Sequence, residues 1–280
     1  MSEAESMSLR TPNSFKTGIT GADRILQYTA FVWFIASAVG QLIFFLYIVS
    51  FYGRAVIAGD LSKWNKVLYA GYIPGDHIGN TALAIHLTLA AYITLAGPLQ
   101  LLPQLRNRYP ALHRWIGRTY VGMAVITSVA GALMLWARNT IGDLYQHLGT
   151  SLDAMLIVVF AAQTLRYAMA GKIATHRRYA LRLFIAVSAS WFFRVGLMFW
   201  IVVNQGPAGF DPDTFQGPAL SILAFAESLL PLAVLEIYLR SRASQSSWKK
   251  IGSAIGLFVL TVSMCVGIFG ATMGMWIRHI

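Results

Sequence analysis

Long apolar runs dominate this chain and decide what it can fold into. Each run is close to the twenty or so residues that an α-helix needs to cross about 30 Å of hydrocarbon. Such a segment satisfies its backbone hydrogen bonds internally, so the runs predict an all-α, polytopic membrane bundle of about seven transmembrane helices. The predicted spans cover residues 27–52, 79–105, 114–137, 148–170, 179–203, 218–239 and 251–277.

Composition supports lipid as the solvent. Of the 280 residues, 56% are hydrophobic and 12% are charged, whereas soluble domains carry about 25% charged residues. The net charge is +11, but lysine and arginine cluster at the ends of the apolar runs, where they contact lipid headgroups and set topology. The lipid bilayer is therefore the expected partner, and no nucleic-acid partner is expected.

The distribution of positive charge predicts the orientation. Most of the 22 lysines and arginines fall in the first 26 residues and in the connections after the second, fourth and sixth spans. By the positive-inside rule, the amino terminus lies inside and the carboxy terminus outside. We therefore expect a cytoplasmic tail over residues 1–26 and a single transmembrane domain over 27–280, with a core four-helix region at about 79–203.

Four histidines fall at alternating ends of four consecutive predicted spans. His86 and His147 lie toward outer ends, 61 residues apart, and His113 and His176 lie at inner ends, 63 residues apart. Nearly equal separations predict that each pair shares a depth in the membrane. Two facing imidazoles on parallel helices can occupy both axial positions of a haem iron. The pattern predicts one or two b haems with these histidines as metal ligands.

A second interpretation of the inner histidines needs no cofactor. His113 and His176 stand beside Arg114 and Arg177, so each can be an interfacial cationic residue near lipid phosphate. His86 differs, because it lies about seven residues inside its span among Ala, Ile and Leu. A polar ring at that depth needs a partner, which favours a functional role.

Three ionisable residues lie at a depth similar to that of His86. They are Asp153, Arg194 and Glu227, in the fourth, fifth and sixth spans. A charge at that depth is costly unless it is paired, so we expect Arg194 to form an ion pair with Glu227 or Asp153. This polar cluster either holds three helices together or presents Arg194 to a haem propionate or an anionic substrate.

Three further features limit the alternatives. The predicted outer connection at 53–78 carries aromatic residues that can lie along the membrane surface or cap an outer-facing site. Gly270 and Gly274 favour close helix contact, within the fold or across a homodimer.

Cys265 is the only cysteine, which excludes an internal disulfide, a thiolate zinc cluster and a c-type haem attachment. Any bound metal must use histidine or carboxylate ligands.

Three stretches carry a family resemblance. HLTLAAYITLAGPLQLLP, LHRWIGRTYVGMAVITSVAG and ATHRRYALRLF resemble the bacterial predicted-membrane-protein family known as domain of unknown function 2306. The resemblance covers roughly residues 80–195. It implies a multi-pass protein of the bacterial inner (plasma) membrane, and the family name carries no activity.

A more distant resemblance concerns the cytochrome b561 group. LHRWIG is similar to the LHSWLG-type helix start of that group, and GDLYQHLG resembles the segment entering one of its haem-bearing helices. In that group, four histidines on consecutive helices bind two b haems, pairing first with third and second with fourth. The resemblance implies that His86 pairs with His147 and His113 with His176, with Arg194 near a propionate. It further implies a possible transmembrane oxidoreductase that takes electrons from a small donor such as quinol.

Two other functions stay open at this point. In one, the chain is a cofactor-free transporter or sensor that binds a small anionic or amphiphilic ligand in an outer-facing polar site formed by His86, Asp153, Arg194 and Glu227. In the other, it is an accessory subunit of a larger membrane complex. Nucleotide loops, nucleophilic triads and a Schiff-base lysine in the seventh span are all absent from the sequence.

Overall fold

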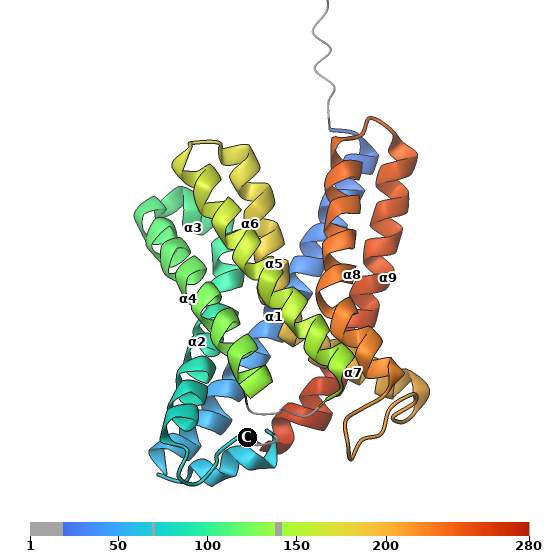
Figure 1. The fold of residues 1–280 in the computed structure, drawn as a ribbon. Helices are drawn as coiled ribbons and strands as arrows, with labels where there is room; N and C mark the ends of the chain where they lie inside the picture. The colour runs from blue at the N-terminus through green and yellow to red at the C-terminus, as the bar shows by residue number, and fades with distance from the viewer. Residues whose placement is uncertain (1–18, 69–70, 138–141, 280) are drawn as a thin grey trace, which may run out of the picture.

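The computed structural model describes residues 19–68, 71–137 and 142–279. Within these ranges the chain is an all-α bundle, as predicted (Figure 1). Its elements are α1 (Gly21–Ile57), η1 (Leu61–Lys66), α2 (His77–Leu101), α3 (Pro103–Arg108), α4 (Pro110–Ala137), α5 (Leu144–Met169), α6 (Ile173–Val187), α7 (Ala189–Asn204), α8 (Pro218–Ala243), α9 (Ser247–Ala271), η2 (Thr272–Trp276) and η3 (Ile277–His279).

The membrane-spanning prediction is confirmed. Six helices of the described residues are long and apolar enough to cross a membrane, and the bent pair α6 and α7 makes a seventh crossing if it is one span. The chain is thus a multi-pass membrane protein. Residues 1–18 of the expected cytoplasmic tail lie outside the described residues, and the inside and outside assignment stays a prediction.

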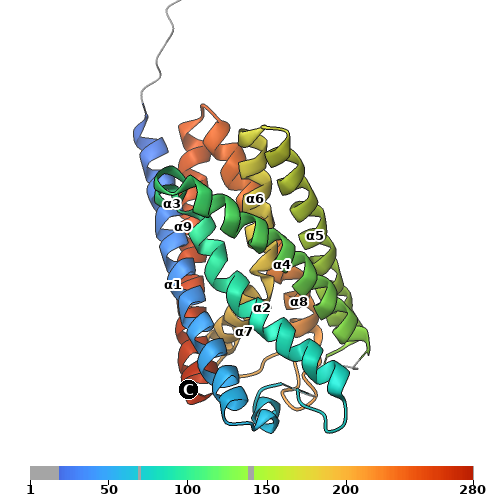
Figure 2. The same ribbon diagram turned by 90° about the vertical axis from the view of Figure 1, so that its left-hand side faces the viewer.

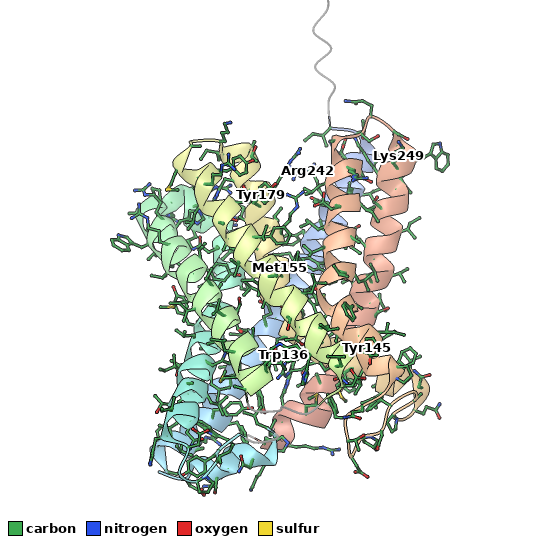
Figure 3. All side chains as sticks on the ribbon, viewed as in Figure 1. Trp136, Tyr145, Met155, Tyr179, Arg242 and Lys249 are labelled. Carbon is green, nitrogen blue, oxygen red and sulfur yellow. The ribbon has the colours of Figure 1, made fainter. Side chains whose placement is uncertain are left out.

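The basic connections gather at one end of the bundle. The start of α1 and the α2–α4, α5–α6 and α8–α9 connections lie together at this end, which we name the basic end (Figures 1 and 2). Tyr179, Arg242 and Lys249 lie here, whereas Trp136 and Tyr145 lie toward the opposite end (Figure 3). That opposite end carries η1, the α7–α8 connection and the carboxy terminus, and we name it the cap end.

Polar side chains fix the basic end. Thr20 and Asp23 form a capping box that starts α1, which satisfies two orphan backbone donors. Lys250 of α9 pairs with Asp23, Nζ to Oδ1 at 2.6 Å. Between α6 and α8, Arg182 binds Glu236 through Nε and Nη2, both at 2.6 Å from Oε1. These contacts join the helices at the end where the sequence places most of its charge.

The span predicted at 79–105 is shorter than expected. Leu102 is extended, with φ −71° and ψ 118°, because a residue before proline is disfavoured in the helical region. The helix α2 therefore ends at Leu101, and Pro103 starts the short helix α3. Pro98 stays inside α2. The adjacent Gly97 allows close contact with Phe184, since a Cβ there would lie 3.1 Å from its Cδ2 atom.

The fifth predicted span is broken at Ser188. The axes of α6 and α7 differ by 53°. The Ser188 hydroxyl donates to the Phe184 carbonyl at 2.8 Å, and such back-bonding by serine bends helices. Gln41 of α1 donates to the same hydroxyl oxygen at 3.0 Å. The break therefore has a hydrogen-bonded cause in the middle of the bundle, which periodicity alone does not reveal.

The helices pack around this broken span. The chain of neighbours runs α1–α2–α4–α5–α8–α7–α9 and returns to α1, with α6 against α5 and α8. Four consecutive residues of α6, Leu183–Ala186, are all buried. This last turn of α6 is enclosed by its neighbours, whereas Ile173 at the start of the same helix is 50% exposed. The outer faces carry large exposed apolar side chains, such as Phe31, Ile35 and Val39 of α1, which suits contact with lipid.

Glycines bring α9 and the following turn η2 onto α7. A Cβ on Gly270 would lie 3.1 Å from Val202, and one on Gly274 would lie 2.8 Å from Met198. Gly267 packs directly against the Val195 backbone. The small-residue face of α9 is thus used inside the fold, so the glycine pair supplies no support for a homodimer.

Candidate functional site

A cavity of about 500 Å³ lies among α1, α2, α4, α5 and the α6–α7 break. This volume falls in the range of ligand pockets. Apolar side chains such as Leu83, Leu87 and Ile93 line the wall formed by α2, and Ala124 and Ile157 line the walls of α4 and α5. Polar and charged side chains also line the cavity, and they include three of the residues that the sequence singled out, His86, Asp153 and Arg194.

Arg194 stands in this cavity wall, about one and a half turns beyond the break. Its Nη1 donates to the carbonyl and the hydroxyl of Ser190, each at 2.7 Å. Its Cζ lies 5.3 Å from the Phe44 ring centroid, within the range of a cation–π contact. These contacts hold the guanidinium in place while using a single one of its nitrogens.

The ion pair predicted for Arg194 is not formed. Across the described residues, salt bridges within 4.0 Å join Lys63 to Asp60, Arg182 to Glu236 and Lys250 to Asp23. Arg194 instead acts on Glu227 from a longer distance. The reason is geometric: Arg194 folds back on its own helix to Ser190, so its charge faces the cavity without a carboxylate bound to it.

Asp153 and Glu227 come together where α5 and α8 touch. A Cβ on Gly149 would lie 2.7 Å from the Ala224 carbonyl oxygen, so the two backbones are in direct contact there. Asp153 follows Gly149 by one turn and Glu227 follows Ala224 by nearly one turn, which places them on the same faces. Both residues are buried, with 9% and 7% of their surfaces exposed, and their charges interact.

Asp153 reaches the cavity but Glu227 does not line it. The Oδ1 atom of Asp153 is buried and has no hydrogen-bond partner among the residues that the structure describes. Buried polar atoms are normally paired with protein or water. An unpaired carboxyl oxygen at a cavity wall is therefore a place where a ligand, water or proton belongs.

His86 occupies the opposite wall. Its ring packs on Gly131 of α4, where a Cβ would lie 3.1 Å from the imidazole Cε1 atom. The ring lines the cavity, and its Nδ1 atom is buried without a partner in the described part of the chain. Arg194 is close enough for its charge to act on this ring. The expected polar layer of His86, Asp153, Arg194 and Glu227 is thus gathered around one cavity.

The cap end closes over the cavity. Lys66, Val67, Leu68 and Gly71 of the connection after α1 line it. Trp64 is 1% exposed, and its ring lies edge-on to Tyr52 at 6.1 Å between centroids. The 53–78 connection was expected either to lie along the membrane surface or to cap a site. The structure supports the cap for the described residues, because Trp64 is packed in the protein core.

Aromatic and carboxy-terminal residues complete the wall, and no sequence pattern indicated them. Tyr47 and Tyr52 of α1, Trp191 of α7, and Trp276 and His279 after α9 line the cavity. The carboxy terminus reaches it through the π-helical turn Thr272–Trp276, and such turns are frequent at functional sites. Trp276 is 1% exposed. An apolar run that ends in tryptophan is typical of the end of a membrane span, so the sequence pattern does not indicate a place in the cavity wall.

His147 lies apart from this lining. The described histidines that line the cavity are His86 and His279. The His147 ring packs edge-on against Trp136 of α4, with 5.5 Å between centroids. Its Nε2 atom is buried without a partner among the described residues. The pairing of His86 with His147 on one iron therefore stays a prediction without a shared cavity to support it.

His113 and His176 lie near one another at the basic end, close enough for their charges to interact. The His176 Nδ1 atom is 3.0 Å from the Thr164 carbonyl oxygen. A hydrogen bond of this kind fixes the tautomer of a metal-binding histidine and leaves Nε2 free to ligate. The His113 Nδ1 atom is buried without a partner in the ranges described.

Among the described residues, no group of three or more His, Cys, Asp and Glu side chains is placed to hold a metal ion. A haem iron needs at most two axial ligands from the protein. This observation therefore does not test the binding of haem b at the predicted histidines, which stays a prediction.

Comparison with known families gives the class of the chain. A family model described as "Predicted membrane protein (DUF2306)" matches residues 83–223. The chain belongs to the DUF2306 family. The match includes His86, Asp153 and Arg194, so much of the cavity wall of this DUF2306 protein lies inside the family region. Glu227, Lys66 and Trp276 lie outside it.

Other comparisons add no relative. No curated protein matches the chain, and no solved structure matches it. The DUF2306 description names a membrane protein without an activity. The resemblance to the cytochrome b561 group stays a sequence-based prediction.

Proposed function

We propose that this protein is a carrier or sensor that binds a small anionic amphiphile in the cavity. The observation that carries the proposal is Arg194, which stands in the wall of a cavity of about 500 Å³ and has no carboxylate within 4.0 Å among the described residues. A cation at membrane depth is costly unless an anion meets it. A ligand anion at Arg194 would supply the missing charge.

Several hydrogen-bond donors lie in the residues that line the cavity. Lys66 adds a second cation at the cap end. The indole Nε1 atoms of Trp191 and Trp276 are buried without a partner in the described parts of the chain, and an indole nitrogen is a donor only. A ligand rich in acceptor oxygens, such as a carboxylate, sulfonate or phosphate, matches these donors.

The remaining walls favour an apolar body on the ligand. Leu83, Leu87 and Ile93 of α2 line the cavity, as does Ile157 of α5. Burial of apolar ligand surface contributes about 25 cal/mol per Å². The acidic head would therefore lie at Arg194 and the apolar body along α2 and α5.

Binding of naphthalene-2-sulfonate tests the proposal, since this probe is small, aromatic and permanently anionic. Titration into purified protein in nanodiscs, followed by tryptophan fluorescence, is expected to show saturable binding. Arg194→Gln is expected to weaken it by at least about tenfold, as for loss of a charged hydrogen bond. Arg242→Gln, at the basic end, serves as the matched charge control, and naphthalene-2-sulfonamide as the neutral ligand control.

Two results would contradict the proposal. One is equal binding of the sulfonate and the sulfonamide. The other is a loss of affinity in Arg242→Gln as large as that in Arg194→Gln, which would point to general attraction by net charge.

Haem-dependent electron transfer is the second candidate function, and the nearness of His113 to His176 favours it. A pyridine haemochrome spectrum of protein from a haem-replete host tests it. Under this candidate, His176→Ala removes the Soret band, whereas the exposed Trp248→Ala leaves it unchanged. A spectrum without haem would remove the candidate, together with a role as a transmembrane oxidoreductase that uses quinol.

A further inference from the structure

Arg194, Asp153 and Glu227 do not sum to zero charge when all three are ionised, in contrast to an isolated ion pair. Asp153 and Glu227 each lie about one turn beyond the Gly149–Ala224 contact, and the charges of Asp153 and Arg194 both act on the Glu227 carboxyl group. Two ionised carboxylates and one guanidinium would leave one net negative charge at membrane depth. Net charge in such surroundings is strongly unfavourable, so one proton, on either Asp153 or Glu227, gives the neutral state.

An anion at Arg194 changes that balance. It would add one negative charge to a neutral group of Arg194, Asp153 and Glu227. Neutrality returns when a proton from bulk water adds to the carboxylate that is still ionised, so that both carboxyl groups become neutral acids. The unpaired Oδ1 atom of Asp153 at the cavity wall is available to such a proton.

Other charged or titratable groups also face this region and have to be counted. Arg194 of α7 acts on His86 of α2 and on Tyr47 and Tyr52 of α1. The cap end contributes Lys66 and His279. Lys66 is exposed, so water solvates its charge and it does not enter the balance at membrane depth. The α4 lining adds the hydroxyl side chains of Thr127 and Ser128 and no ionisable group among the residues described. His86 is therefore the main competing site for a proton near Arg194.

We infer that anion binding at Arg194 is coupled to the uptake of one proton by the Asp153–Glu227 pair. The inference rests on the proposed function, because it needs an anion in the cavity. It makes the transported or sensed species a proton together with a monovalent anion. Movement of that pair would carry no net charge across the membrane.

The coupling has a defined signature in wild-type protein. Uptake of one proton makes the dissociation constant rise about tenfold for each unit increase in pH. The probe is again naphthalene-2-sulfonate, which stays ionised between about pH 6 and about pH 8, so the slope reports on the protein. Calorimetry in two buffers of different ionisation enthalpy gives the number of protons independently, with about one expected per sulfonate bound.

Variants assign the proton to the carboxyl pair. In Asp153→Asn/Glu227→Gln, Arg194 has no carboxylate to balance it, so we expect affinity that does not change with pH and is at least as high as in wild type. Each single substitution leaves one carboxyl group, and uptake of about one proton is expected to persist. In His86→Gln uptake is also expected to persist, whatever the affinity.

The outcomes separate this inference from the proposed function. Sulfonate binding that requires Arg194 but shows no pH slope in wild type would overturn the coupling and leave the proposed function standing. Loss of proton uptake in His86→Gln would overturn the assignment to the carboxyl pair. Absence of Arg194-dependent binding at any pH would remove the proposed function and the coupling with it.

Discussion

Gln41 of α1 donates a hydrogen bond from Nε2 to the Ser188 hydroxyl oxygen, 3.0 Å away, at the break between α6 and α7. Both residues are buried, with 2% and 7% of their surfaces exposed, and both line the cavity. A buried amide at this depth needs its partner. The contact thus fixes the position of the break relative to α1, and with it the position of Arg194.

Ser188→Ala should destabilise the protein. The substitution leaves the Gln41 amide without its acceptor, at a cost of about 1–3 kcal/mol in the free energy of unfolding. Denaturation in detergent measures the loss. Adding Gln41→Leu should recover part of it, because both polar partners are then gone. Ser263→Ala is the control, since that exposed hydroxyl bonds only within α9, and an equal loss there would argue against a special role for Ser188.

Gly149→Ala should also destabilise the protein. Its new Cβ would meet the Ala224 carbonyl oxygen at 2.7 Å, and relieving such overpacking costs about 1–3 kcal/mol. Gly252→Ala in α9 is the matched control, because nothing lies within 4 Å of a Cβ there, and we expect no loss of stability. Denaturation in detergent again measures the free energy of unfolding. Equal stability of the two variants would mean that α5 and α8 are not in direct contact.

Lys66→Gln should lower the association rate of the anion by a larger factor than it raises the dissociation rate. Lys66 lies at the cap-end lining of the cavity, where a cation raises the association rate of an anion. We expect a decrease of a few fold that shrinks at high salt, measured by stopped-flow tryptophan fluorescence with naphthalene-2-sulfonate. Lys63→Gln is the control, because Lys63 pairs with Asp60 and does not line the cavity. Equal effects of both variants would indicate attraction by net charge alone.

Asp143 should link stability to pH at the cap end. Burial opposes its ionisation, but hydrogen bonds from the Ser221 hydroxyl at 2.6 Å and the Gln146 amide at 2.8 Å outweigh it and lower its pKa. A carboxyl group with a lowered pKa stabilises the fold above its unfolded value of about 3.9, and that contribution is lost as the pH falls through the folded pKa.

Asp143→Ala is therefore expected to cost about 1 kcal/mol near neutral pH, as for loss of a helix N-cap. The difference from wild type should shrink below about pH 4, as followed by thermal unfolding in detergent. Asp213→Asn, in the exposed α7–α8 connection, is the control. A difference that stayed constant across this pH range would show that ionisation of Asp143 does not contribute.

The polar layer shows how far sequence reasoning reached. Counting residues along each helix predicts a similar depth for His86, Asp153, Arg194 and Glu227, and that shared depth stays a prediction. The first three line one cavity, whereas Glu227 interacts with Asp153 from outside the lining. Counting residues does not give rotation about a helix axis or side-chain conformation. The expected Arg194 ion pair was therefore wrong, and the bond from Arg194 to Ser190 replaced it.

Trp276 and His279 show the opposite case. Their sequence context is the end of an apolar run, and nothing local indicates that the chain turns into the cavity. The contact depends on Phe44, whose ring lies 5.3 Å from that of Trp276 and which is far away in sequence. Such a contact becomes visible only when both helices are placed.

The sequence by itself determined the all-α architecture, the approximate spans and the gathering of positive charge at one end. These properties depend on the length and polarity of each segment against a hydrocarbon layer of fixed thickness, so each segment can be assessed alone. The tertiary structure decided the break at Ser188, the closure of the cavity by the cap end and the direction of Arg194. Those features arise where faces of distant helices meet, because close packing there selects side-chain contacts that no single segment specifies.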